Sequence, residues 1–183
     1  MAVLRRALSV LALLVASSPG ALARPVYSSR EQALARAFPA PAVTERKTYF
    51  LTEAERERAS RLAKAKIESS LVVAYVGRGP KGLVGTAYFD THTVRTMPET
   101  ILVTVRPDGG VEGVEVVAFG EPEDYLPRPR WLRLFGGKRL DANLAVGRGL
   151  AHVTGATLTT RAIAEAVRRV LAIHSVISAA APP

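Results

Sequence analysis

The chain has 183 residues, which is the size of a single domain with little room beyond it. It contains no cysteine, so disulfides, cysteine-ligated zinc, iron–sulfur clusters and Cys-x-x-Cys-His haem attachment are excluded. The 25 Lys and Arg residues outnumber the 16 Asp and Glu residues, and the resulting formal charge of +9 is dispersed along the chain and favours anionic partners.

The N-terminus has the pattern of a secretory signal peptide over residues 1–23. Arg5 and Arg6 precede an apolar run at 7–16, and Ala21-Leu22-Ala23 supplies a small-residue cleavage site. The run is shorter than the ~20 apolar residues that a membrane-spanning helix needs. We therefore expect a periplasmic or otherwise extracytoplasmic protein, with an uncleaved N-terminal anchor as the alternative. No nucleic-acid partner is expected there, and the charge instead suggests phosphate, acidic proteins or peripheral membrane association.

Residues 24–70 are predicted to form an N-terminal helical segment. A first short helix starts at Ser29 and runs to Phe38, where Pro39 follows. A second begins after Thr52, whose hydroxyl and the Glu three residues later form a capping box, and its charged pattern continues to about Ser69.

From Leu71 the pattern changes to strands. Runs at 71–76 and 83–89 are joined by a Gly- and Pro-rich loop, and alternating apolar residues at 101–105 and 111–116 flank a Pro-Asp-Gly-Gly turn. An aromatic-rich short helix is expected at 131–135. The sequence therefore predicts hairpins that form an antiparallel sheet.

The last element is predicted to be a helix with one apolar face. Its apolar positions recur at helical spacing: Ile163, Val167, Val170, Leu171, His174 and Ile177. His174 is expected to be a packed side chain with one satisfied nitrogen. Strands grouped before this helix indicate an α+β fold, with the main domain at 71–178 and a disordered tail at 179–183.

Residues 77–82 fit the pattern G-x-G-x-x-G and follow a predicted strand. A dinucleotide site needs that loop to open a helix, whereas here a second strand follows, and Pro80 lacks an amide proton. We therefore interpret this stretch as a hairpin loop.

A polar stretch between the two predicted hairpins contains Asp90, His92, Arg95 and Glu99. It is either a solvated connection or a functional loop. No pair among the three histidines has the spacing of a helical metal site, and no serine lies in a nucleophile elbow.

Four threonine hydroxyls occur within the seven residues 154–160, directly before the apolar repeat of the last helix. Thr159 or Thr160 could simply cap this helix, and Gly155 could adopt an unusual backbone angle. Capping needs only one hydroxyl, however, and a helix N-terminus with small residues beside it also suits a phosphate group.

Thr154-Gly155-Ala156-Thr157-Leu158-Thr159 resembles the flavinylation motif of the FMN-binding domain family, [Ser/Thr]-Gly-Ala-[Ser/Thr]-x-[Ser/Thr]. That domain occurs in the flavin subunits of the Rnf and Na⁺-translocating NADH:quinone oxidoreductase complexes and in related exported proteins. The sequence around Glu121-Pro122 and the stretch 131–138 also resemble family segments, although residues 123–126 lack the family's usual glycines.

The resemblance implies FMN joined by a phosphoester to Thr159, transferred from FAD by an extracytoplasmic flavin transferase. It implies that Thr154, Gly155, Ala156 and Thr157 position the phosphate and ribityl chain. It also places Leu158 and the Glu121 loop near the ring, with Arg95 as a further contact.

The expected function is therefore that of an exported stand-alone electron carrier between a donor and an acceptor redox protein. Two alternatives stay open. One is a flavin-dependent reductase that uses His92, Glu99 or Tyr125 as acid or base. The other is a non-redox binding module in which Thr159 only caps a helix.

Overall fold

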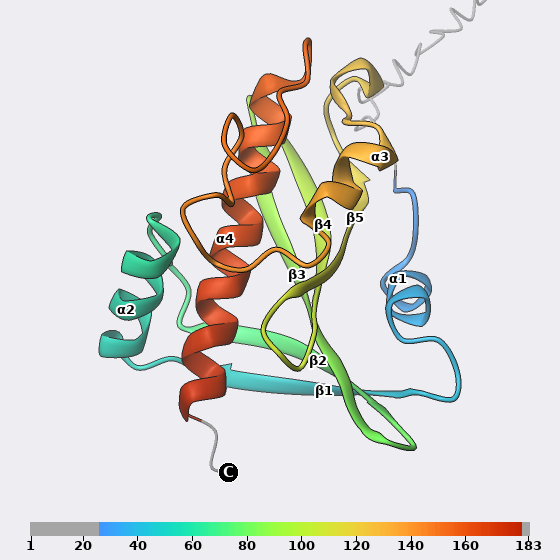
Figure 1. The fold of residues 1–183 in the computed structure, drawn as a ribbon, viewed down its shortest axis with the longest axis vertical. Coiled ribbons are helices and arrows are strands. Elements are labelled where there is room, and N and C mark those ends of the chain that lie inside the picture. The colour runs from blue at the N-terminus through green and yellow to red at the C-terminus, as the bar shows by residue number, and fades with distance from the viewer. Residues whose placement is uncertain (1–25, 181–183) are drawn as a thin grey trace, which may run out of the picture.

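The computed structural model of this protein describes residues 26–180 (Figure 1). The predicted signal peptide lies outside the described residues, as do the last three residues of the predicted tail. The prediction of a disordered tail is wrong for Ala179 and Ala180, because they form the end of the last helix, α4 (Thr157–Ala180).

Two short helices near the N-terminus start where the sequence predicts, and both have a capping box. Helix α1 (Arg30–Ala37) is capped by Ser29, whose hydroxyl accepts from the amide of Gln32. Helix α2 (Glu53–Ala63) is capped by Thr52 and Glu55 in the same way, and it ends at Lys64 in a left-handed conformation. It is thus shorter than its charged pattern predicts.

Five antiparallel strands form one sheet in the order β1-β2-β3-β4-β5, so every strand pairs with its neighbour along the chain. Their bounds are β1 (Val43–Phe50), β2 (Leu71–Gly79), β3 (Gly82–Val94), β4 (Met97–Val105) and β5 (Val111–Phe119). Short helical turns follow at η1 (Glu123–Tyr125), α3 (Pro129–Leu132) and η2 (Arg133–Phe135). The α+β prediction with hairpin-paired strands and a final helix is confirmed.

Two strand assignments differ from the sequence-based ones. Strand β1 lies in the segment predicted to be helical or linker, and it pairs along its whole length with β2. The polar stretch after Phe89 is not a loop either, since β3 continues to Val94 and turns directly into β4, with His92 opposite Glu99. These residues therefore lie on a rigid sheet.

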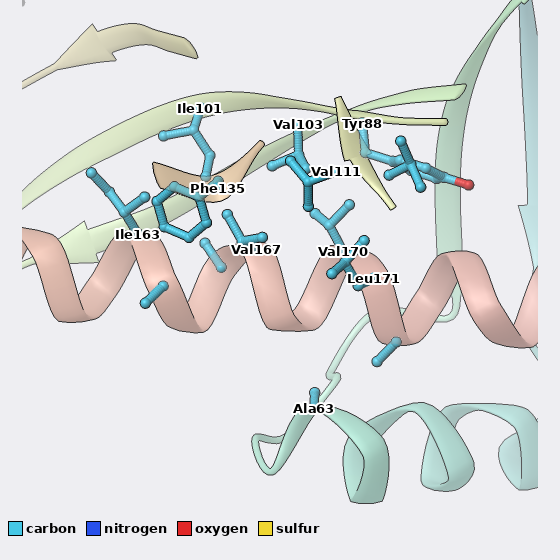
Figure 2. Packing of buried hydrophobic residues seen from close by; sticks show 14 of the residues in the cluster. Ala63, Tyr88, Ile101, Val103, Val111, Phe135, Ile163, Val167, Val170 and Leu171 are labelled. Carbon is cyan, nitrogen blue, oxygen red and sulfur yellow. The ribbon is translucent and has the colours of Figure 1, made fainter. Parts of the chain in front are cut away.

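Helices cover the sheet on both faces. Helix α4 lies along one face, with α2 beside it, and their apolar side chains share the main core with the strands (Figure 1). Figure 2 shows Ile163, Val167 and Val170 of α4 directed at Ile101 and Val103 of the sheet. Helix α1 and Phe38 cover the other face. No helix within residues 26–180 is both long and apolar enough to cross a membrane.

The G-x-G-x-x-G stretch is a hairpin, as interpreted from the sequence. Gly79 pairs with Gly82 at the ends of β2 and β3. Gly77 pairs with Gly85 under the Phe38 ring, and a Cβ added to Gly77 would overlap that ring. Because Gly77 has no side chain, the Phe38 ring can pack directly on the sheet. Packing therefore explains the glycine at this position.

Candidate functional site

The threonine motif forms the entrance to α4. Residues 151–156 are an irregular loop, Gly155 has a φ of +83°, and the helix begins at Thr157. A Cβ added to Gly155 would meet no atom within 4 Å, so the space beside this backbone is open. The predicted position of the motif at the N-terminus of the last helix is confirmed.

The first turn of α4 has free donors. The first helical backbone bond runs from the amide of Thr160 to the carbonyl of Ala156, at 2.9 Å. Within residues 26–180 the amides of Thr157, Leu158 and Thr159 donate to no protein group. Such amides, together with the positive end of the helix dipole, favour an anion.

The four hydroxyls of this segment have different environments. Thr157 donates weakly to the carbonyl of Val153 at 3.5 Å, and Thr160 donates to the carbonyl of Thr157 at 3.1 Å. Thr154 is exposed, whereas Thr159 is 1% exposed. Thr159 is the third residue of α4, so it lies inside the helix and not at the cap position that one simpler interpretation of the sequence gave it.

A pocket of about 600 Å³ opens beside the motif loop. This volume lies in the roughly 300–1,000 Å³ range of cofactor sites. One wall is the loop itself and the other is the segment around α3, and Trp131 joins the two by donating to the carbonyl of Ala151 at 2.7 Å. The lining residues are Asp124, Leu126, Arg128, Arg130, Trp131, Leu134, Ala151, His152, Val153, Thr154 and Ala156.

The chemistry of this pocket fits a flavin nucleotide. Arg128 and Arg130 contribute two positive charges to the lining, and Asp124 contributes one negative charge. The Trp and Leu side chains supply apolar surface for a ring. A second pocket of about 650 Å³, along β5, contains no motif residue and includes Glu112 and Glu115 in its wall. Those carboxylates disfavour phosphate, so the pocket at the motif is the candidate site.

Glu121 and Arg95 lie together, but outside the lining of this pocket. The Glu121 carboxylate accepts from the amides of Thr96 and Met97, both at 3.0 Å, and these bonds hold the pKa of Glu121 below its usual range. Arg95 has a φ of +50° in the same β3–β4 turn, and its guanidinium lies 4.2 Å from the ring centre of Tyr125. Glu121 thus fixes the β3–β4 turn, and Arg95 contacts the last residue of η1, which precedes α3 in the chain.

A buried ionic network lies between the sheet and α4. His92 contacts Asp90 through Nδ1 at 2.9 Å and Glu99 through Nε2 at 3.1 Å. Arg169 of α4 donates to both oxygens of Asp90, at 2.8 and 3.2 Å. Glu99 is fully buried, and its Oε1 atom has no partner among residues 26–180.

The pKa values in this network follow from burial and pairing. Burial raises the pKa of Glu99, although His92 opposes this effect. For His92 burial acts downward, but hydrogen bonds to Asp90 and Glu99 outweigh it and the pKa is raised. Burial alone would raise the pKa of Asp90, yet His92 and Arg169 lower it. His174, which was expected to be packed, contacts the Tyr88 hydroxyl through Nδ1 at 2.9 Å.

Residues 97–172 match the FMN-binding domain family. This match includes the whole motif, and it confirms the family resemblance that the motif indicates. The chain is also similar to the crystal structure of Shewanella oneidensis NqrC, with 20% identity, a TM-score of 0.53 and coverage of 74% of this chain and 84% of that one. At this identity the likeness shows the fold. No curated protein matches the chain.

Sequence reasoning missed Arg128 and Arg130 of the pocket and Arg169 of the ionic network. Arg128 and Arg130 precede the motif by more than twenty residues, and only the fold brings them to it, together with Trp131. Arg169 lies within the predicted last helix, and no local pattern pairs it with Asp90.

Proposed function

We propose that this protein is an exported electron carrier whose FMN is joined by a phosphoester to Thr159. The observation that carries the proposal is a fully matched motif at a helix N-terminus, inside the residues that match the FMN-binding domain. Bound FMN supplies reversible one- or two-electron chemistry, and the protein supplies orientation and electrostatics. Donor and acceptor would both be redox proteins, and a flavin transferase would attach the cofactor outside the cytoplasm.

The residues of the site have distinct roles in this proposal. The free amides of the first turn of α4 stabilise the phosphate diester, and Gly155 leaves room for the ribityl chain. Trp131 and Leu134 offer apolar surface to the ring, while Arg128 and Arg130 offset the negative charge of the reduced flavin. Leu158, which is 48% exposed, lies at the protein surface beside the attachment point.

The carrier is favoured over a reductase by the position of the candidate acids and bases. His92 and Glu99 are committed to the buried network, and Tyr125 stacks against Arg95, so none of the three lines the pocket. The helix-cap explanation of Thr159 is weakened because Thr159 lies within the first turn of α4, beyond the cap position.

The attachment is tested by the intact mass of mature protein purified from a host that exports it and supplies the flavin transferase. We expect one esterified FMN on the wild type and none on Thr159→Ala. Thr159→Ser is the matched control, since it keeps a hydroxyl at the same position, and it should keep the flavin. Because Thr159 is 1% exposed, attachment requires the loop at 151–156 to open.

Three outcomes contradict the proposal in different ways. If the wild-type protein folds but its mass is unmodified, the proposal of a covalent flavin is wrong. Retention of an esterified FMN in Thr159→Ala moves the ester to another hydroxyl of the motif. Rapid turnover of small acceptors by the isolated flavoprotein would favour the reductase over the carrier.

A further inference from the structure

The segment that contains α3 and η2 lies between two hollows of the protein surface. Leu132 and Arg133 line the pocket along β5, whereas Trp131 and Leu134 line the pocket at the motif. We call residues 128–134 the α3 ridge. One side of this ridge is thus a wall of the candidate flavin site, and its other side faces a separate hollow.

Buried aromatic side chains hold the α3 ridge in place. Trp131 is 4% exposed, Phe135 is fully buried, and their rings pack edge to face with centres 5.3 Å apart. The Trp131 indole also donates to the carbonyl of Ala151 in the motif loop. The backbone of the ridge therefore has a fixed position relative to the flavin site, which lowers the cost of ordering when a partner binds.

The arginines of the α3 ridge are available to an outside partner. Arg128, Arg130 and Arg133 are exposed, and none of them forms a salt bridge or a side-chain hydrogen bond in the described part of the chain. By contrast Arg139, a few residues later, pairs with Asp108 at 2.8 Å. Unpaired positive charges on a rigid surface attract an anionic partner over a distance of several ångströms.

The remaining groups around the α3 ridge give it direction and an apolar contact. No carboxylate occurs within residues 128–134, while η1 carries the exposed Glu123 and Asp124. The surface is therefore positive on the ridge and negative on η1, which favours one orientation of a partner. Leu134 is 40% exposed and adds apolar area. Arginine beside a small apolar area is typical of protein interfaces, and electron-transfer interfaces are small.

We propose that a redox partner of the flavin docks on the α3 ridge through an acidic patch beside its own redox centre. The inference rests on the proposed function as an electron carrier. A partner on the ridge is separated from a ring in the motif pocket by ~10 Å, the width of one helix. In one encounter the reduced flavin loses one electron and the redox centre of the partner gains it. Opposite charges speed this encounter, and salt screens them.

The experiment uses the flavinylated protein with its flavin reduced and follows flavin oxidation by stopped-flow absorbance. Two protein oxidants are compared: plastocyanin, which is an acidic copper protein, and cytochrome c, which is a basic haem protein. We expect the wild-type rate with plastocyanin to fall at least about tenfold between ~20 mM and ~500 mM salt. The rate with cytochrome c should not fall.

Arg133 is the residue to change, because it belongs to the ridge but does not line the motif pocket. At low salt Arg133→Glu should react with plastocyanin about tenfold more slowly than the wild type, and Arg133→Gln about threefold more slowly. Both differences should disappear at high salt. If Arg133→Glu does not fold, Arg133→Gln and the salt dependence of the wild type decide the matter.

Arg58→Glu is the matched control. Arg58 is exposed on α2, which lies across α4 from α3 (Figure 1), and the substitution changes the net charge by the same amount as Arg133→Glu. It should slow the reaction with plastocyanin by less than about twofold. Equal losses in the two variants would mean that only net charge matters, and they would overturn the docking site.

Other outcomes also contradict this inference. It is wrong if the wild-type rate falls with salt for cytochrome c and not for plastocyanin. It is also wrong if Arg133→Glu keeps the plastocyanin rate but no longer binds vesicles of phosphatidylglycerol that the wild type binds, because the ridge is then a membrane contact. A wild type that carries no flavin overturns the proposed function, and this inference with it.

Discussion

His92 is the residue on which the buried network depends, because it alone contacts both carboxylates. Its pKa is raised in the folded protein, since its hydrogen bonds to Asp90 and Glu99 outweigh the effect of burial. A raised pKa gives stability that is fully present below the unfolded pKa of about 6.5 and is lost as pH rises through the folded pKa. We predict that His92→Gln lowers the free energy of unfolding by about 1–3 kcal/mol near pH 6 and by less near pH 9.

Urea unfolding at the two pH values checks this prediction. His152→Gln is the control, since His152 is exposed and makes no hydrogen bond with the described residues; it should change stability by less than about 0.5 kcal/mol. A loss that is equal at both pH values would mean that His92 is neutral in the folded protein. His174 cannot produce the expected trend, because burial lowers its pKa and the sign of its contribution is opposite.

The sequence grouped candidate site residues only where they are contiguous or nearly so. Residues 154–159 could be assigned because one helix N-terminus gathers them, and Asp90, His92 and Glu99 were grouped as polar neighbours. Their pairing could not be assigned, since it depends on the antiparallel register that sets His92 opposite Glu99. The roles of Glu121 and Arg95 also depend on the β3–β4 turn.

Helix α4 is held to the sheet by polar side-chain contacts in addition to its apolar face, and Arg169–Asp90 is the ion pair among them. Arg169 donates twice to the mostly buried Asp90, whose other contact is with His92. We predict that Arg169→Met lowers the free energy of unfolding by about 2–4 kcal/mol, because it leaves a carboxylate buried without its cation. Urea denaturation measures the loss.

Arg161→Met is the matched substitution on the same helix, where Arg161 is exposed, and it should cost less than about 0.5 kcal/mol. Equal effects of the two variants would mean that the Asp90 pair does not stabilise the docking of α4. Loss of the Arg169–Asp90 ion pair should also reduce flavin attachment, since the motif lies at the start of α4. Arg161→Met should leave flavin attachment unchanged.

Elements with strong local signals were predicted, and elements that depend on distant pairing were not. Ser29 as a helix start and the capping box at Thr52 predicted where both helices begin, and the structure has them there. Strand β1 has three adjacent charged residues at 45–47 and a mostly exposed surface, so it lacks the apolar alternation of a strand. Only its pairing with β2 makes it one. The end of β3 was missed for a related reason, because buried polar residues replace apolar ones there.

Residues 26–70 are part of one folded unit with the sheet. The backbone amide of Tyr27 donates to the carbonyl of Val117 on β5, and α1 with Phe38 covers one face of the sheet. Strand β1 completes the sheet, and α2 packs its alanines against α4 on the other face. The domain predicted at 71–178, and the shorter family match at 97–172, both omit these contacts.

We predict that a fragment of residues 71–178 does not fold cooperatively, whereas a fragment of residues 26–178 does. The shorter fragment loses α1, β1 and α2, which exposes Tyr75, Leu102 and Val117 on one face and leaves β2 as an unprotected edge. Burial of apolar surface is the main favourable term in folding, so a single-layer sheet with one helix lacks enough of it. Urea denaturation followed by circular dichroism compares the two fragments: the longer should give one transition with an m-value typical of its size, and the shorter no sharp transition. A sharp transition in the shorter fragment would establish the boundary at residue 71 and reduce residues 26–70 to an accessory segment.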